Sequence, residues 1–343
     1  MAITICESLP AVSTIKAEFP LSPHAKQTKT NLEFKLKGIL SGADHRRLLI
    51  IGPCAADFEY SVIEYISKLS SLQHEVKDKL LIIPRVYTAK PRSSFSGYTG
   101  MIYYPTPSGP QNISEGIRHA RKLHLRILDE FDMISADELL YGDLIEYLQD
   151  VVSYFAIGAR SVEYQVLPWL ASGLDCPVGI KNSRCGDPGV LVRAIAAVQK
   201  EHTFSFGGSI VNTTGNKYAH GILRGFSDCA GIPHSNINLL LDESFYQNYH
   251  SICGTSPRLI VDCSHDNSGR NACNQVDVLH RVLSLINTCS PASESIRGFM
   301  LESYLLPGKC NCSMTQIGKS VVDECIGWEE TQAVVRQIAN QLH

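Results

Sequence analysis

The sequence lacks a long apolar run, a strong excess of charge of either sign and a paired-cysteine motif, and each absence excludes a class of protein. No apolar stretch approaches the ~20 residues of a membrane-spanning helix, so we expect no membrane partner. The net charge of −3 gives no bulk attraction to nucleic acid, so any anion must be bound locally. The expected partners are therefore small molecules.

The cysteines indicate a reducing compartment. All 12 are scattered along the chain without a CxxC pair, which argues against a disulfide scaffold. The opening MAITICESLP has an acid and a proline where a secretion signal needs a basic and then an apolar stretch. A reduced, cytoplasmic protein is expected.

Eight short apolar runs end in a polar, mostly charged or metal-binding, side chain. Such a run suits a parallel strand buried on both faces, and its polar end then lies at the mouth of a barrel. The predicted strands are Leu48–Cys54, Leu80–Arg85, Leu125–Glu130, Phe155–Arg160, Pro177–Lys181, a weaker sixth around Phe204–Asn212, Leu259–His265 and Phe299–Glu302.

Segments with helical periodicity alternate with these runs, as in a barrel or an open doubly wound sheet. The predicted helices are Ser61–Val76, Ser114–His124, Ala136–Val152, Gly189–Glu201, Ala272–Cys289 and Thr331–His343. An open sheet usually has a glycine-rich phosphate turn after its first strand, and GPCAADFEY is not one. We therefore predict an α/β protein with a (β/α)8 TIM barrel.

The barrel is expected to fill one catalytic domain, residues 45–343. Residues 1–44 differ from the rest, with Pro20, Pro23 and a polar, basic stretch. Such an extension usually packs on a neighbouring subunit or frays.

Four residues that commonly bind metals are far apart in sequence. Cys54, His265 and Glu302 end the predicted strands 1, 7 and 8, and strands 1 and 8 are neighbours in a closed barrel. With Asp323 they form a mixed soft and hard set, suited to one divalent ion of the Mn, Fe, Co or Zn class. Spacing alone leaves a second interpretation open, because a buried cysteine or a lone histidine is usually structural.

Basic side chains gather at the same predicted rim, at or just beyond the ends of strands 2, 4 and 5. Uncompensated, such a cluster would repel itself, and a bound polyanion removes that cost. Two separate groups of cations would fit two phosphorylated molecules. These cations are Arg85, Lys90, Arg92, Arg160 and Lys181.

Ten strings occur in a fixed order between about residues 45 and 340. They are IGPC (51–54), RVYTAKPRSS (85–94), DEFDMI (129–134), AIGARSVEYQV (156–166), LASGLDCPVGIKN (170–182), IVNTTGN (210–216), ILRG (222–225), DCSHDNS (262–268), LES (301–303) and GKSVVDECIGWEET (318–331). Together they resemble the type I 3-deoxy-D-arabino-heptulosonate 7-phosphate (DAHP) synthases. Any single string is modest support, but the joint match is highly specific.

The resemblance implies a condensation of phosphoenolpyruvate with erythrose 4-phosphate and water, releasing phosphate, as the first step of the shikimate pathway. The implied ligands of one divalent metal ion are Cys54, His265, Glu302 and Asp323. The residues implied around phosphoenolpyruvate are Arg85, Lys90, Glu130, Arg160, Lys181 and Arg224. Of these, Arg160, Lys181 and Arg224 are expected at its phosphate. Pro91, Arg92 and Ser93 match the segment that receives the aldose phosphate.

The catalytic groups expected from this match are Lys90, Glu130 and His265. Lys90 lies between the two anion subsites, so we expect it to donate a proton to the new hydroxyl. Glu130 is a candidate for holding the attacking water, for which a phosphate oxygen is the alternative. His265 counts both as a metal ligand and as a catalytic group.

Some strings depart from the common family pattern. Residues 97–100 read GYTG where many members have GWKG, and residues 181–186 read KNSRCG in place of KNGTDG. Two alternatives stay open: the same chemistry with another acceptor, as in 3-deoxy-octulosonate 8-phosphate synthase, or an inactive regulatory paralogue. The string KPRSS argues against the former, and the intact ligand set against the latter. Because family members are commonly dimers or tetramers, a homodimer or homotetramer is expected.

Overall fold

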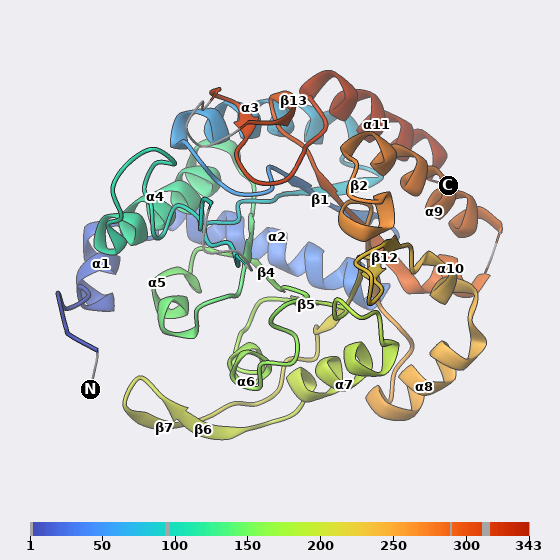
Figure 1. Ribbon diagram of the computed structural model, residues 1–343, viewed down its shortest axis with the longest axis horizontal. Helices are drawn as coiled ribbons and strands as arrows, with labels where there is room; N and C mark the ends of the chain where they lie inside the picture. Colours follow the sequence, from blue (N-terminus) through green and yellow to red (C-terminus); the bar gives the residue numbers. More distant parts are fainter. Residues whose placement is uncertain (1–2, 93–96, 289, 311–315, 343) are drawn as a thin grey trace.

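The computed structural model describes residues 3–92, 97–288, 290–310 and 316–342. Eight parallel strands form one sheet in the order β2-β1-β12-β11-β8-β5-β4-β3, at the centre of the molecule in Figure 1. The strands are β1 (Arg47–Gly52), β2 (Leu80–Pro84), β3 (Ala136–Glu138), β4 (Tyr154–Ile157), β5 (Val178–Lys181), β8 (His220–Leu223), β11 (Leu259–Asp262) and β12 (Ile296–Glu302).

The two end strands of this order, β2 and β3, meet and close the barrel. Arg85 and Ala136 form a parallel bridge, and the Val86 N–H donates to the Ala136 carbonyl at 2.8 Å. Elsewhere the ladders are longer: β1 pairs with β12 over five residue pairs, Leu48↔Gly298 through Gly52↔Glu302. The predicted TIM-barrel fold is confirmed, and its seam lies between β2 and β3.

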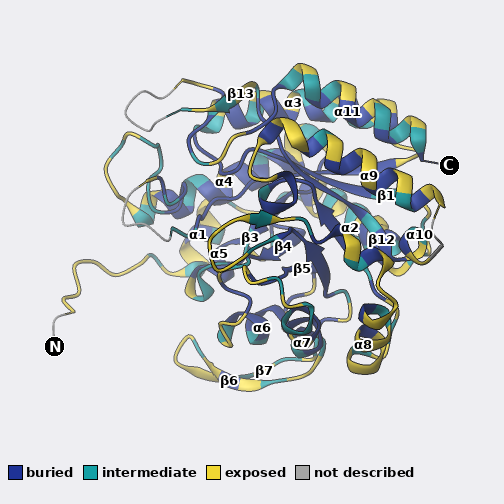
Figure 2. Cartoon of the chain, turned by 45° about the vertical axis from the view of Figure 1, so that its right-hand side comes forward, coloured by how far each residue is buried: buried dark blue, intermediate teal, exposed yellow. Residues whose placement is uncertain are grey.

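The strands are buried on both faces, which explains why they read as unbroken apolar runs. All residues of β2, β5 and β11 are buried, and Figure 2 shows the centre of the barrel in the colour of buried residues. Outer helices supply the second layer. The longer ones are α3 (Glu59–Val76), α4 (Ile113–Phe131), α7 (Pro188–Gln199), α8 (Glu243–Cys253), α9 (Gln275–Thr288) and α11 (Trp328–Gln341).

Short elements complete the chain between these helices and strands. The short helices are α5 (Ile145–Leu148), α6 (Val166–Ala171) and α10 (Ser290–Ser295). The small strands are β9 (Phe226–Ser227) with β10 (Pro233–His234), and β13 (Leu306–Lys309) with β14 (Lys319–Ser320). Within the described ranges, no helix combines the length and the apolar character that a bilayer crossing requires.

Two helices lie before the barrel, α1 (Val12–Glu18) and α2 (Pro23–Ser41). Ser22 caps α2, its hydroxyl accepting from the Ala25 N–H at 2.9 Å. Leu36, Ile39 and Leu40 of α2 are buried in the main core, and α2 passes behind the strands in the view of Figure 1. Within the segment before residue 45, α1 and α2 are therefore packed on the barrel rather than frayed, whereas residues 3–11 form no helix.

The third predicted strand is wrong. Leu125–Glu130 lies inside α4, where the buried residues Ile117, Ala120 and Leu128 repeat at helical spacing. The true third strand, β3, is only three residues long and includes two acids, so it gives almost no apolar signal. It lies inside the predicted helix Ala136–Val152, which is therefore wrong over most of its length.

The sixth predicted strand is also misplaced. Residues around Phe204–Asn212 form an antiparallel hairpin, β6 (Thr203–Phe206) with β7 (Ser209–Asn212), outside the barrel sheet. The sixth barrel strand is β8, whose four residues are buried. The hairpin turns at two glycines with positive φ, Gly207 and Gly208.

Candidate active site

A cavity of about 300 Å³ opens at the carboxyl ends of the strands. Active sites of parallel barrels lie at this end. Eight lysine and arginine side chains line the cavity, against five aspartates and glutamates. This excess of positive charge favours anionic molecules inside.

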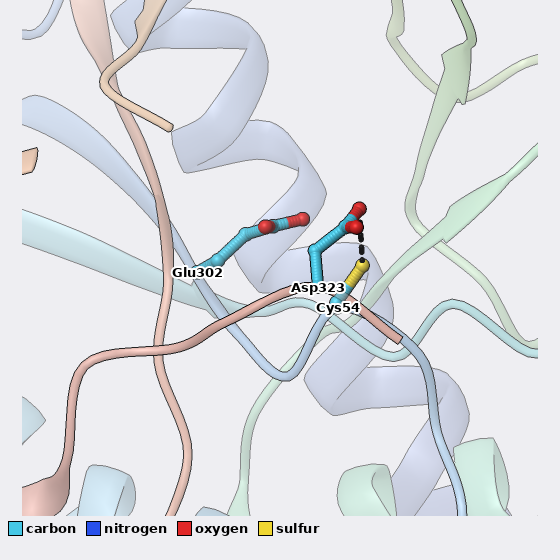
Figure 3. Close-up of side chains that lie close together, drawn as sticks. All are labelled: Cys54, Glu302 and Asp323. Atoms are coloured by element: carbon cyan, nitrogen blue, oxygen red, sulfur yellow. Dashed lines mark hydrogen bonds between the residues drawn. The ribbon is translucent and has the colours of Figure 1, made fainter. Parts of the chain in front are cut away.

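A cluster of potential metal ligands forms one wall. Cys54, Glu302 and Asp323 each place one ligand atom within 4.8 Å of the others (Figure 3). The Asp323 Oδ2 lies 3.4 Å from the Cys54 Sγ. The pairing of Gly52 with Glu302 at the ends of β1 and β12 explains why Cys54, two residues on, emerges beside that carboxylate.

The chemistry of this cluster fits a divalent cation. Burial and the neighbouring Glu302 carboxylate hold the pKa of the Cys54 thiol well above its usual range. A thiol beside two carboxylates therefore keeps its proton unless a cation arrives to displace it. A thiolate with carboxylates suits the Mn, Fe, Co or Zn class.

His265 lies next to this cluster but outside the group of three. Its Nε2 is 3.7 Å from Glu302 Oε1, while its Nδ1 is 3.0 Å from Asp262 Oδ2 and 2.6 Å from the Ser264 hydroxyl. These contacts orient the ring with Nε2 toward the cluster. The φ of His265 is 56°, a left-handed conformation that is unusual for histidine and is found most often at functional sites.

Arg85 lies beneath the cluster and is fully buried. One of its nitrogens donates to Glu302 Oε1 at 2.7 Å and to the Cys54 carbonyl at 3.3 Å. Burial opposes its charge, but the Glu302 carboxylate outweighs this and raises the pKa of Arg85. Its buried Nε and Nη1 have no hydrogen-bond acceptor among the described residues. Buried donors usually have one, so a ligand oxygen here would satisfy them.

Lys90 and Glu138 form the opposite wall. Lys90 Nζ is 3.8 Å from Glu138 Oε2. Burial acts to lower the pKa of Lys90, but Cys54, in its thiolate form, and the Glu138 carboxylate outweigh it, so the pKa is raised and Lys90 stays a charged ammonium. The backbone N–H of Lys90 donates to the Thr99 carbonyl at 2.9 Å, and Arg92 Nε donates to the Tyr98 carbonyl at 3.0 Å.

A third wall is cationic. Arg160, Lys181 and Arg224 come from the ends of β4, β5 and β8, and all three line the cavity. Burial, with the neighbouring guanidiniums of Arg184 and Arg224, lowers the pKa of Arg160. Lys181 is held by Asp262 at 2.9 Å, and burial still lowers its pKa. An anion among these side chains would relieve their repulsion.

Glu130 does not lie in the cavity, contrary to the prediction. It is at the end of α4, its side chain 43% exposed, and it pairs with Arg126 at 2.5 Å. Burial is slight there, and Arg126 lowers the pKa of Glu130. The prediction failed because Leu125–Glu130 resembles a strand that ends at Glu130, whereas these residues lie in α4.

The other predicted residues fall into two groups. Those that line the cavity are Lys90, Pro91, Arg92, Arg160, Lys181, Arg224, His265, Glu302 and Asp323. Arg85 and Cys54 contact this set from below. Ser93 lies outside the described residues.

Sequence reasoning missed Glu138, Arg184, Asp266 and Arg270, which all line the cavity. Asp266 bonds both Arg224 and Arg270, the latter at 2.7 Å. The apolar residues up to Leu128 are spaced as in a helix. This spacing indicates that the third strand lies after Leu128, where β3 ends at Glu138. The others occupy loops, where no periodicity marks them.

Comparison with known proteins agrees with this geometry. The model of the DAHP synthetase I family matches residues 18–336. The chain belongs to this family. It is 38% identical to the Phe-sensitive phospho-2-dehydro-3-deoxyheptonate aldolase of Escherichia coli (strain K12), across 98% of this chain and 95% of that protein. It is 32% identical to the Trp-sensitive enzyme of the same strain, across 97% and 95%.

A solved structure extends the likeness to three dimensions. The phospho-2-dehydro-3-deoxyheptonate aldolase of Francisella tularensis SCHU S4 matches with a TM-score of 0.89 and 29% identity, covering 99% of this chain and 98% of that one. As a full-length member of the DAHP synthetase I family, the chain is an enzyme of the DAHP synthase class.

Proposed function

We propose that this enzyme condenses phosphoenolpyruvate with erythrose 4-phosphate and water, giving DAHP and inorganic phosphate. The observation that carries the proposal is the pairing, at one cavity, of a Cys54–Glu302–Asp323 cluster with a wall of cations, of which Lys181 and Arg224 are buried. Carbon 3 of the enol attacks the aldehyde carbon, water adds at carbon 2, and phosphate then leaves. Two anions must be held together for this reaction, which suits the cavity's excess of cations.

We assign the phosphoenolpyruvate phosphate to Arg160, Lys181 and Arg224. The lowering of the Arg160 pKa by the guanidiniums of Arg184 and Arg224 supports this assignment, because an anion there would offset the repulsion. The two unpartnered donors of Arg85 support a second contact, to an anionic oxygen of the same substrate. Arginine forks suit phosphate and carboxylate oxygens equally.

The acceptor is assigned to the segment of Lys90, Pro91, Arg92 and Ser93. We assign to Lys90 the proton donated to the new hydroxyl, because it lines the cavity next to Pro91 and Arg92 and faces Glu138. In place of Glu130 we assign the positioning of the attacking water to Glu138, whose carboxylate faces Lys90 at 3.8 Å.

We further propose that Cys54, His265, Glu302 and Asp323 hold one divalent ion of the Mn, Fe, Co or Zn class. When bound, such an ion supplies polarisation of the aldehyde oxygen. Asp262 and Ser264 hold the His265 ring in the orientation this requires.

We also propose that the protein is a cytoplasmic homo-oligomer. Ile3, Ile5 and Leu9 near the amino terminus are exposed, which supports an intersubunit role for residues 1–44. Sedimentation of the full chain, compared with a chain lacking residues 1–9, tests this: the full chain should sediment as a dimer or tetramer.

Phosphate release from phosphoenolpyruvate tests the reaction. It should require Mn²⁺ and an aldose phosphate together, with erythrose 4-phosphate preferred over arabinose 5-phosphate by at least tenfold in kcat/KM. A preference for the five-carbon sugar would replace the assigned acceptor. No release with any aldose phosphate would favour the inactive paralogue.

A further inference from the structure

The seam between β2 and β3 is closed at its active-site end by side chains. Backbone pairing across it stops at the Arg85↔Ala136 bridge and the bond from Val86 N–H to the Ala136 carbonyl. β2 ends at Pro84, and the chain that follows it runs on to Lys90 without strand structure, while β3 ends at Glu138. Among the described residues, backbone pairing across the seam therefore stops before the chain reaches the facing residues Lys90 and Glu138.

Asp137 bridges this gap with its carboxylate. Its Oδ1 accepts from the Thr88 N–H at 2.8 Å and from the Glu138 N–H at 2.7 Å. Its Oδ2 accepts from the Thr88 hydroxyl at 2.6 Å. One buried carboxylate thus fixes the residue two before Lys90 and the backbone of Glu138 itself.

His124, from α4, holds this carboxylate from behind. Its Nε2 is 3.2 Å from Asp137 Oδ2, and its Nδ1 is 2.8 Å from the Ser135 hydroxyl. Because the carboxylate accepts, Nε2 carries a proton and donates it to Asp137. His124, Ser135 and Thr88 are 0% exposed and Asp137 is 1% exposed, so water does not compete for these bonds.

The other face of Thr88 is fixed as well. Its carbonyl accepts from the Ile102 N–H at 3.1 Å. Gly100, with φ 104°, passes so close that an added Cβ would lie 2.3 Å from that carbonyl oxygen. Thr88 is thus clamped between the 97–102 segment and Asp137, and this sets the path of the chain into Lys90, Pro91 and Arg92.

We propose that Asp137, supported by His124, is a positioning residue that fixes Lys90 opposite Glu138 by closing the seam. The inference rests on the proposed function, in which Lys90 and Glu138 act on the acceptor and on water. We call the hydrogen bonds of Asp137 to Thr88, Glu138 and His124 the clasp. Loosening the clasp should harm acceptor use, while the phosphate wall at the ends of β4, β5 and β8 and the metal cluster of β1 and β12 stay intact.

The test compares the loss of two buried hydroxyl groups, one at Thr88 beside Asp137 and one at Tyr154 at the opposite end of the barrel. Thr88→Val removes the hydroxyl bond to Asp137 at constant volume, and Thr88→Ser keeps it. Tyr154→Phe is the control, because the Tyr154 hydroxyl bonds His220 at 2.8 Å between the first residues of β4 and β8, at the far end of the barrel. Asp137→Asn is the stronger lesion on the clasp.

We expect Thr88→Val and Asp137→Asn to lower kcat/KM for the aldose phosphate about tenfold or more, since small misplacements of reacting groups are costly. The KM for phosphoenolpyruvate and the Mn²⁺ bound per chain should change less than twofold. Thr88→Ser should restore near wild-type values. Equal losses for Tyr154→Phe, or an unchanged acceptor kcat/KM for Thr88→Val, would overturn the proposal.

Hydrogen exchange separates this proposal from the proposed function. If the wild-type chain turns over no aldose phosphate, the proposed function fails on its own. The clasp is then judged by the backbone amides of Thr88 and Lys90, which should exchange at least tenfold faster in Asp137→Asn and at the wild-type rate in Tyr154→Phe. Unchanged exchange in Asp137→Asn would overturn it.

Discussion

The two sides of the cavity are held in different ways. On the side of β1, β11 and β12, backbone ladders of four or five residue pairs bring Cys54, Glu302 and His265 together. On the side of β2 and β3, the ladder stops early and a buried side-chain clasp sets Lys90 against Glu138. Residues fixed by a ladder are visible in a sequence as strand ends, whereas residues fixed by a clasp are not.

Removing a ligand on the ladder side should have the largest effect. Cys54→Ala is expected to lower bound Mn²⁺ per chain to less than a tenth and to reduce turnover at least 100-fold, because the cluster loses its thiolate. Elemental analysis and phosphate release measure the two quantities. Cys176→Ala, a buried cysteine before β5 and outside the cavity, is the control; intact metal binding in Cys54→Ala would refute the ligand assignment.

On the side of β2 and β3, Glu138 in the cavity and Glu130 on the surface allow the same substitution to be compared at two positions. Glu138→Gln should lower kcat about 10 to 100-fold, because the group facing Lys90 loses its charge. Glu130→Gln should leave kcat within twofold, because Glu130 lies on the surface. Steady-state kinetics decide between them, and a larger loss for Glu130 would restore the sequence-based assignment.

A smaller effect, on stability rather than on turnover, is expected from changing Asp57, a buried carboxyl three residues after Cys54. Asp57 bonds Tyr304 and Ser61, its second oxygen has no partner among the described residues, and burial raises its pKa to about 6. The folded state thus binds this proton more tightly than the unfolded state. The protonated Asp57 therefore stabilises the folded state. This contribution to the free energy of unfolding is fully present below the usual pKa of Asp and is lost as pH rises through about 6.

Asp57→Asn should remove this dependence. Relative to the wild type, the free energy of unfolding of Asp57→Asn should rise by about 2 kcal/mol between pH 4 and pH 7. Urea unfolding of metal-free protein at both pH values measures it. A difference that stays constant with pH would show that folding leaves the pKa of Asp57 unchanged.

The same contrast explains what could be predicted from the sequence. Strands 1, 2, 4, 5, 7 and 8 are long or apolar enough to be recognised, and their ends supplied most of the cavity residues. β3 has three residues, two of them acidic, and it forms through its pairing with β4 and the contacts of Asp137. Tertiary contacts of this kind leave no periodic pattern, so Glu138 was missed and Glu130 was chosen instead.

The central claim is that this cavity unites one divalent ion with two phosphorylated substrates. The most direct measurement is phosphate release by chelator-stripped enzyme titrated with Mn²⁺, in the presence of phosphoenolpyruvate and erythrose 4-phosphate. We predict no release without Mn²⁺, saturation at one ion per chain, and no release when either substrate is omitted. Release from phosphoenolpyruvate alone, or turnover that does not depend on Mn²⁺, would contradict the claim.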